Sequence, residues 1–323
     1  STNGAGEKYE STIGAKLSFS PSKAQDIIFD ISQNELSYET TKGNSIAPTA
    51  NSSRVEHERL SWSAAHNGRW MLYQEIAKKD DWTNGVQSKN SQEVTNTTLD
   101  AKLTLPLPNH IVKVGGQLMR ADLDGIKNEA SVPSYPKNNP DNIKVDSYAL
   151  FIEDEFSLND KIIFTGGIRL DDDERYGSYW SPRLYGIYKA TDTITFRAGA
   201  AKGFKAPTIR QSSSSYCMTS GSTVALGILC GNPDLKAEES LTTELGVRYD
   251  APSGLSLALV LFNTDFENKV MSYGTSDIEP VTGREVYIYD NIADVTIRGA
   301  EVSARVPFQK KWVLTTNYAY TDS

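Results

Sequence analysis

The sequence predicts an all-β protein, built as a transmembrane antiparallel up-and-down β-barrel. Apolar and polar residues alternate with a period of two through most of the 323 residues, whereas helical periodicity is nearly absent. The alternating segments run for roughly 9–13 residues, which suits tilted strands crossing a bilayer better than the usual globular strand of about 5–6 residues. The connections between these segments are alternately short and long, which is the third observation behind the prediction.

The alternation marks about fourteen strands along the chain. They are expected near 9–19, 26–38, 54–66, 70–80, 93–105, 110–122, 146–157, 161–172, 180–190, 193–204, 238–250, 255–266, 293–307 and 312–321. In KIIFTGGIRLD, for example, Ile162 and Phe164 face one side, and Thr165 and Arg169 face the other. The strand at 255–266 begins apolar on both faces, so its pattern does not decide which face meets lipid.

Short and long connections alternate, which places the short turns at one end of the sheet and the long loops at the other. The short connections are 21–25, 67–69, 106–109, 158–160, 191–193, 251–254 and 309–311. The long connections are 39–53, 81–92, 123–145, 173–179, 205–237 and 267–292. Outer-membrane barrels have this asymmetry, with short periplasmic turns and long extracellular loops. A β-sandwich would mix Greek-key crossovers with shorter strands, and a propeller would show a per-blade repeat that is missing here.

Composition agrees with a barrel and excludes other classes. A net charge of −8 and a pI near 5.1 argue against a nucleic-acid partner, which would select a basic face. The mean hydropathy of −0.44 is compatible with strands that alternate apolar and polar residues, so outer-membrane lipid is an expected partner. Aromatic residues near strand ends predict girdles at the two interfaces. They are Tyr148, Phe156, Trp180, Tyr188, Tyr249 and Phe266.

No arrangement of residues predicts an enzyme. The three histidines are far apart in the sequence, and no metalloprotease, nucleophile-elbow or phosphate-loop motif occurs. The acids at 122–125 and 171–173 lack the spacing of a calcium loop and are interpreted as solvated loop acids. Cys217 and Cys230 lie close together in a polar stretch, which predicts a local disulfide in an oxidising compartment.

Six phrases in the second half of the chain, in order and on the expected strands, resemble a known family. They are YALFIEDEFSL (148–158), GGIRLDDDERYGSYWSPRL (166–184), AKGFKAPTIRQ (201–211), GNPDLKAEES (231–240), GLSLALVLFNTDFENKV (254–270) and IRGAEVSARVPF (297–308). The resemblance is to TonB-dependent outer-membrane receptors, in the branch of catecholate-siderophore and colicin I receptors. Barrels of that family have about 22 strands around a plug domain. Residues 1–323 are therefore expected to be a partial barrel region without the plug and the terminal strands; a complete fourteen-stranded porin-like barrel is the structural alternative.

The resemblance implies an anionic, aromatic ligand, because ferric catecholates are both. Arginine and tyrosine would hold such a ligand by charge and cation–π contact. The alternation turns Arg169, Arg183 and Arg197 into the lumen on three consecutive strands. The further ligand-binding candidates, on the long-loop half, are Arg175, Tyr176, Tyr179, Lys205, Arg210 and Tyr216, with Trp180 and Lys202 beside them. The alternative is that the inward charges form lumen salt bridges or contact a plug, and that the others are ordinary polar surface.

The function that the resemblance implies is uptake of a ferric siderophore across the outer membrane of a Gram-negative bacterium. The siderophore carries its own iron, so no cofactor held by the protein is expected. The TonB–ExbB–ExbD complex would supply energy through the plug, and a colicin or phage could dock on loops 205–237 and 267–292. A haem receptor is disfavoured, because FKAP (204–207) and NPDL (232–235) enclose no histidine. The alternatives from other classes of protein are a passive porin and a soluble β-protein.

Overall fold

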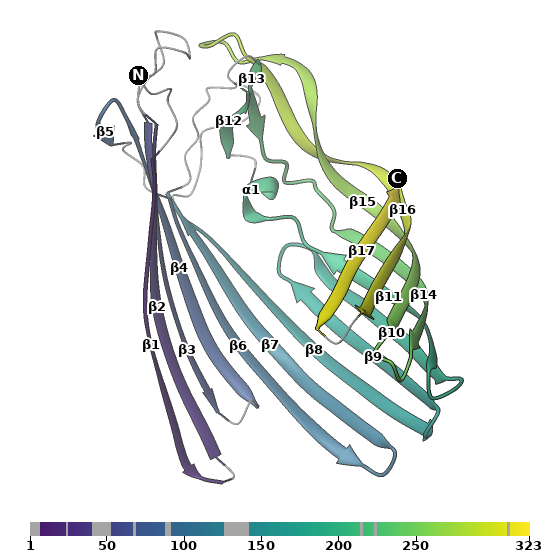
Figure 1. Ribbon diagram of the computed structural model, residues 1–323. Coiled ribbons are helices and arrows are strands. Elements are labelled where there is room, and N and C mark those ends of the chain that lie inside the picture. The colour runs from purple at the N-terminus through teal and green to yellow at the C-terminus, as the bar shows by residue number, and fades with distance from the viewer. Residues whose placement is uncertain are drawn as a thin grey trace.

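One curved antiparallel sheet forms almost the whole molecule (Figure 1). The computed structural model describes residues 7–23, 25–40, 53–66, 69–87, 92–125, 142–213, 216–222, 225–308 and 311–323. The sheet has seventeen strands in these residues, of which β5 (Val86–Gln87), β12 (Cys217–Ser222) and β13 (Ala225–Cys230) are short. The fourteen long strands are β1 (Glu7–Ser22), β2 (Gln25–Thr40), β3 (Ser53–His66), β4 (Trp70–Thr83), β6 (Gln92–Leu107), β7 (His110–Asp124), β8 (Asn142–Asn159), β9 (Ile162–Asp173), β10 (Gly177–Lys189), β11 (Ile194–Lys205), β14 (Glu238–Asp250), β15 (Ser256–Ile278), β16 (Glu285–Phe308) and β17 (Trp312–Asp322). The predicted number and order of the strands are confirmed.

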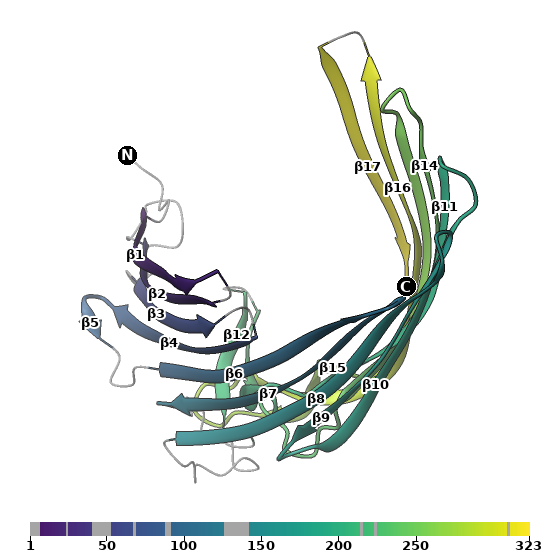
Figure 2. The same cartoon turned by 90° about the horizontal axis from the view of Figure 1, so that it is seen from below.

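The long strands form a meander in which each one pairs antiparallel with the next. β4 continues to β6, and β11 continues to β14, so the short strands lie outside this succession. Seen from below, the strands form an open curved wall with β1 and β17 well apart (Figure 2). No pairing between described residues joins β1 to β17. The up-and-down topology is therefore confirmed, and the described wall has two free edges.

The short turns gather at one end of the wall, at the bottom of Figure 1. Asn109 closes the β6–β7 turn with a φ of 62°, a left-handed conformation that asparagine tolerates better than most residues. The Asn159 side chain accepts hydrogen bonds from the backbone N–H groups of Lys161 and Ile162, both at 2.9 Å, and so closes the β8–β9 turn. These local bonds allow connections of a few residues between long strands.

The structure changes the interpretation of two long loops and leaves all or part of three others outside the described residues. The expected loop 173–179 is only a turn at 174–176, because β9 and β10 extend into it. Most of 267–292 is also strand: β15 continues to Ile278 and β16 begins at Glu285, so the two form a hairpin that rises beyond the other strands (Figure 1). Residues 41–52, 88–91 and 126–141, in the other three loops, lie outside the described residues.

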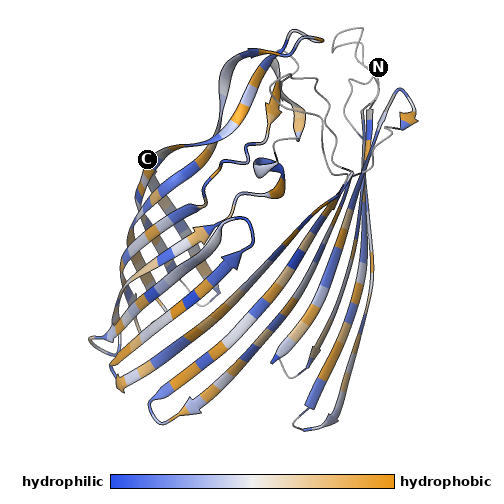
Figure 3. Ribbon diagram, turned by 180° about the vertical axis from the view of Figure 1, so that it is seen from behind, coloured by the Kyte–Doolittle hydropathy of each residue, from blue (hydrophilic) through white to orange (hydrophobic). Residues whose placement is uncertain are grey.

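Hydrophobic and hydrophilic residues alternate along the strands, as the banding in Figure 3 shows, so the two faces of the wall carry different side chains. Leu118, Leu150 and Leu184 on the convex face are 59%, 60% and 62% exposed. Such a large apolar surface fits contact with lipid. Leu257, Leu259 and Leu261 are also exposed, so the structure orients the strand that the sequence left open.

Five of the six predicted girdle aromatics share the parity of the convex face. The exception is Phe266, which is paired with Ser240 and therefore lies on the same face as Glu244. The prediction for Phe266 was wrong because β15 is apolar on both faces over its first residues, so alternation alone could not give its direction.

The most deeply buried apolar cluster lies above the wall and not within it. Cys217 and Cys230 form a disulfide with both residues fully buried, and they pack with Ile228 and Val286. The two cysteines are directly opposite each other in the β12–β13 hairpin. The predicted disulfide is confirmed. No helix in the described part of the chain is long and apolar enough to cross a membrane.

We expect that replacing both cysteines (Cys217→Ala with Cys230→Ala) will open the β12–β13 hairpin more often and leave the wall intact. The bond spans a sequence separation of 13, for which the loop-entropy model gives about 3 kcal/mol. Hydrogen exchange at 226–231 should therefore accelerate, by up to about 100-fold. Exchange at 241–249 in β14 serves as the internal control. Unchanged exchange at 226–231 would show that packing alone holds the hairpin.

Candidate ligand-binding site

The described residues between β11 and β14 (206–213, 216–222 and 225–237) cross the concave side of the wall at its long-loop end; we call them the strap, and this end of the concave side the mouth (Figures 1 and 2). The strap begins with α1 (Ile209–Ser212), a single turn. Thr208 caps this turn, because its hydroxyl accepts from the Gln211 N–H and the Gln211 side chain accepts from the Thr208 N–H. The TIRQ sequence thus fixes the direction in which the strap leaves β11.

One end of the strap is fixed to β16. β13 pairs with β16 in parallel, with Ile228–Cys230 opposite Val286–Ile288. The Asn232 side chain donates to the Tyr289 carbonyl at 3.0 Å. The Asn291 side chain accepts from the Lys236 N–H at 2.7 Å and donates to the Lys236 carbonyl at 3.0 Å. These bonds explain the GNPDLK phrase: it is the seam between the strap and the rising hairpin.

The other end of the strap packs on the inner surface of β6, β7 and β8. Tyr216 and Leu123 are both buried there. Around them pack the partly buried side chains of Val94, Ile143, Ile209 and Met218. Leu123 lies opposite Val94 in register, on the face away from lipid. The strap therefore reaches across the mouth from β16 to the far side of the wall.

Two arginines reinforce this second end. Arg175, in the β9–β10 turn, donates to the Asp173 carboxylate at 3.1 and 3.0 Å and to the Ser212 hydroxyl at 3.1 Å. Arg210 donates to the Gln92 amide oxygen at 2.9 Å and lies over the Tyr216 ring, 5.6 Å from its centroid. Both arginines were ligand candidates, and both hold the strap in this structure.

Tyr176 belongs to the same group. Burial raises the pKa of its hydroxyl, and a hydrogen bond to Ser212 lowers it in part. Arg175 lies over the Tyr176 ring, 5.0 Å from its centroid. Arg175, Tyr176, Arg210 and Tyr216 therefore form one cationic and aromatic cluster at the mouth.

The three predicted lumen arginines lie lower on the concave wall, each with an acidic partner. Arg169 donates to Asp171 at 2.8 Å, and Arg197 pairs with Glu244 at 3.6 Å. Arg183 pairs with Glu153, which also accepts from Lys113 at 3.1 Å. A cavity of about 510 Å³ lies against this part of the wall, lined in part by Lys113, Arg169 and Arg183. The inward direction of the arginines follows the sequence prediction.

A second group of charges lies at the rim, where β11, β14 and β15 meet. Glu238 is buried and accepts from Lys205 at 3.0 Å, Lys269 at 3.3 Å and the Val270 N–H at 2.9 Å. Burial acts to raise the pKa of Glu238, but these three donors outweigh it and hold the pKa below its ordinary value. The candidate Lys205 therefore shares one carboxylate with Lys269, which leaves an excess of positive charge.

The remaining candidates are divided between the two faces. Tyr179 stacks on Phe204 with ring centroids 4.2 Å apart, next to the rim. Trp180 and Lys202 lie on the convex face, since they are paired with Leu170 and Leu241. Those two positions do not face the mouth.

Several residues at the mouth were not predicted from the sequence. Asp173 was interpreted as a solvated loop acid, but it is buried and bonded to Arg175. Asp173 lies two residues before Arg175 at a turn, and this spacing could have predicted the ion pair from the sequence. Gln92, Glu238 and Asn291 gave no such signal, because their partners are distant in the sequence.

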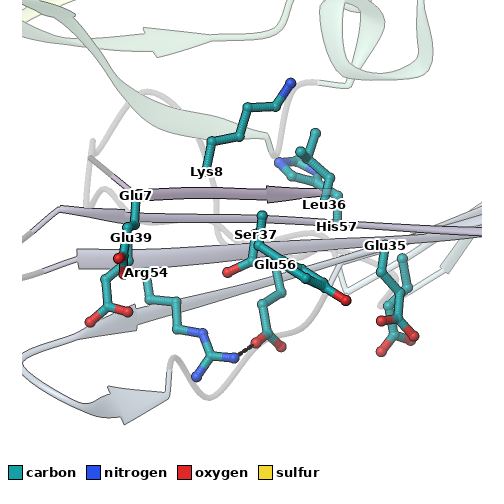
Figure 4. A pocket seen from close by; sticks show the side chains of 11 residues that line it. Glu7, Lys8, Glu35, Leu36, Ser37, Glu39, Arg54, Glu56 and His57 are labelled. Atoms are coloured by element: carbon teal, nitrogen blue, oxygen red, sulfur yellow. Dashed lines mark hydrogen bonds and ion pairs between the residues drawn. The ribbon is translucent and has the colours of Figure 1, made fainter. Parts of the chain in front are cut away.

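A pocket of about 720 Å³ lies near the free edge formed by β1, β2 and β3 (Figure 4). Arg54 and Glu56 form an ion pair there, on the side opposite Lys8 and His57. Its acidic residues are Glu7, Glu35, Glu39, Glu56 and Glu58. Five carboxylates against two cations make this pocket unsuitable for an anionic ligand. Within the described ranges, no group of three or more histidine, cysteine, aspartate or glutamate residues could hold a metal ion.

The wall, with an apolar convex face, a charged concave face and a strap across the mouth, defines a transmembrane β-barrel of the outer-membrane type. The family model described as "TonB dependent receptor-like, beta-barrel" matches residues 3–323, so the chain belongs to that family. This family is one of receptors and transporters, and it places the chain in the outer membrane of a Gram-negative bacterium.

Named relatives are similar along much of the chain. An iron-regulated outer membrane virulence protein of Vibrio cholerae serotype O1 is 27% identical over 335 residues, 99% of this chain and 49% of the relative. The ferric enterobactin receptor PirA of Pseudomonas aeruginosa is 26% identical over 299 residues, 81% of this chain and 40% of the relative. The crystal structure of the siderophore receptor PirA from Pseudomonas aeruginosa superimposes with a TM-score of 0.77 at 23% identity, over 97% of this chain and 56% of that one. The chain thus spans about half the length of these proteins, and the superposition shows a shared fold.

Gly231 should not tolerate a side chain, because the strap returns there against α1. A Cβ atom at this position would lie 2.2 Å from the Ser213 carbonyl oxygen and 2.6 Å from that of Arg210. We expect Gly231→Ala to destabilise the docking of α1 by about 1–3 kcal/mol, seen as faster hydrogen exchange at 209–213. Gly166→Ala is the matched control, since its nearest atom would be 3.9 Å away. Equal exchange in the two variants would contradict the close approach.

Stability of the rim should depend on the ionisation of Glu238. Its lowered pKa means that the carboxylate stabilises the fold above the ordinary glutamate value of 4.5 and loses this effect as the pH falls through the lowered value. We expect Glu238→Gln to cost about 1–3 kcal/mol at pH 7 and to flatten the loss of stability on acidification. Thermal unfolding of the full-length protein in detergent between pH 7 and pH 3 measures both. Glu267→Gln, at an exposed position on β15, should behave as the wild type.

Proposed function

We propose that this chain forms a large part of the barrel wall of a TonB-dependent receptor that takes up a ferric siderophore, of the catecholate class. The observation that carries the proposal is the charge at the mouth. Arg175, Lys205 and Lys269 share two carboxylate partners, Asp173 and Glu238, and Arg210 bonds to the neutral Gln92 amide. These four cations are brought together in a chain of net charge −8. Such a group of cations favours a ligand that is itself anionic.

The aromatic residues support the same ligand class. The rings of Tyr176 and Tyr216 lie beneath arginines. An aromatic ligand with negative oxygens could stack on tyrosine rings and bind guanidinium groups at the mouth. Arg169, Arg183 and Arg197 lie further down the wall and would meet such a ligand after it has passed the strap. Ferric enterobactin, named for the Pseudomonas relative, is an instance of this class.

Energy for uptake would come from the TonB–ExbB–ExbD complex, acting through a plug domain, as the family name implies. The haem alternative is disfavoured, because FKAP (204–207) and NPDL (232–235) enclose no histidine. His66 and His110 lie at the short-turn end, stacked on Trp70 and Phe156, and His57 lines the acidic pocket near β1–β3.

The rising hairpin of β15 and β16 favours a second role, as a docking surface for a bacteriocin or phage protein. Ile278 and Val281 near its tip are 56% and 79% exposed. Exposed apolar side chains on a projecting hairpin are suited to contact with another protein. This role does not compete with uptake, since the hairpin lies above the mouth.

Calorimetric titration of the full-length protein separates a receptor from a passive porin. We expect a ferric catecholate siderophore to bind with a Kd in the micromolar range or tighter, which corresponds to about 8 kcal/mol. A neutral ferric hydroxamate is the matched control, because it offers a similar iron complex without net charge. Millimolar or absent binding of the catecholate would contradict the proposal, and equal binding of the two complexes would contradict the role assigned to the charge at the mouth.

A further inference from the structure

Three of the short turns share one arrangement of aromatic and basic residues. They join β3 to β4, β10 to β11 and β16 to β17. A pair of stacked rings lies at the base of each turn, with centroids 5.9, 6.5 and 6.5 Å apart: His66 with Trp70, Tyr188 with Phe196, and Phe308 with Trp312. A basic residue is the direct neighbour of one ring in each pair: Arg69 before Trp70, Lys189 after Tyr188, and Lys311 before Trp312. We call each such group a turn unit.

The ring pairs of the turn units face lipid. Trp70 lies two residues before Leu72, which is opposite Leu99 on the convex face. Tyr188 and Phe196 are opposite each other on this face, and so are Phe308 and Trp312. Tryptophan and tyrosine concentrate where the apolar band of a membrane protein meets the lipid headgroups. The turn units therefore lie at the headgroup level on the short-turn side of the membrane.

The cations of the turn units have no carboxylate partner in the described part of the chain. Arg69, Lys189 and Lys311 are exposed, and none of them forms an ion pair with a described residue. The turns at 67–69 and 309–311 contain no acidic residue, and the turn at 190–193 contains Asp192. The Lys189 N–H donates to the Lys161 carbonyl at 2.8 Å, so a second lysine lies beside this turn unit.

Cations near the long-loop end of the strands are paired, in contrast to these three. Lys78 contacts Asp80 at 3.1 Å, and Arg120 contacts Asp146 at 2.7 Å. Overall composition does not explain the contrast, because the chain has a net charge of −8 and acids are in excess. The turn units therefore present positive charge to whatever lies outside the protein at this level.

An occupant of a turn unit must be anionic at one end and apolar at the other. The cation lies at the headgroup level, whereas the neighbouring rings face the acyl chains. An acidic peptide satisfies only the first condition. A phospholipid satisfies both, and lysine and arginine near a membrane surface attract anionic lipids.

We propose that the three turn units bind phospholipids with a net negative headgroup from the leaflet on the short-turn side. The phosphate contacts Arg69, Lys189 or Lys311, and the upper part of the acyl chains packs on the ring pair. A zwitterionic headgroup fits less well, because its own ammonium group is repelled by the same cation. This inference needs only the membrane-spanning wall and is independent of the ligand that the mouth binds.

Native mass spectrometry of the full-length protein tests the proposal. The protein is reconstituted in an equal mixture of phosphatidylglycerol and phosphatidylcholine and transferred to detergent, and the lipids that stay bound are counted. We expect phosphatidylglycerol to be retained preferentially. The triple variant Arg69→Gln/Lys189→Gln/Lys311→Gln should lower this preference by up to about fivefold, the factor that one cation near a membrane surface contributes. Arg69→Lys/Lys189→Arg/Lys311→Arg, which keeps the charges, should keep the preference.

The matched control is Lys78→Gln/Arg120→Gln/Lys144→Gln, which removes three cations near the long-loop end, where Lys144 contacts Asp122 at 3.3 Å. It should retain phosphatidylglycerol as the wild type does. Thermal unfolding in detergent checks that the variants are folded, and the three single variants give the same comparison unit by unit.

Two results would overturn the proposal: no preference for phosphatidylglycerol in the wild type, or an equal loss of preference in the two triple glutamine variants. Polyglutamate is the probe for a different occupant. If it binds the wild type and not the turn variant, while lipids are retained without preference, the turns bind an acidic protein segment and the assignment to lipid is wrong.

Discussion

The antiparallel hydrogen-bond ladder determines most of this molecule. Within a membrane every backbone N–H and C=O must find a partner in the protein, and the long meander from β1 to β17 provides these partners strand by strand. The ladder also requires successive side chains to face opposite sides. Leu118 and Leu150 therefore face lipid, and Arg169, Arg183 and Arg197 all face the concave side. The site depends on this pleat before any tertiary contact is made.

Because the wall is one layer with lipid on its outer face, it has little interior of its own. The deepest apolar burial is found where the strap meets β16, with Cys217 and Cys230 of the strap and Val286 of β16 fully buried. The disulfide adds a covalent bond to a segment that pairs with the sheet through β13 over only three residues, and it offsets part of the conformational entropy of a long loop.

Charge is unevenly distributed along the rim of the wall. The pocket near the free edge at β1–β3 brings five glutamates together with two cations, whereas at the mouth Arg175, Lys205 and Lys269 share two carboxylates, Asp173 and Glu238. The chain is acidic as a whole, with a net charge of −8, so the paired cations at the mouth contrast with the rest of its charge.

The sequence by itself determined the strand order, the alternation of short and long connections, the direction of the three lumen arginines and the pairing of the cysteines. All of these follow from local patterns: a period of two, turn residues and two nearby thiols. Only the tertiary structure decided which face of β15 meets lipid, that loop 267–292 is a rising hairpin, and that Arg175 and Arg210 hold the strap. The bond from Arg210 to Gln92 joins residues 118 apart in sequence, and no local pattern encodes such a partner. Candidate residues could therefore be recognised by type and direction, while their roles depended on neighbours that the fold alone brings near.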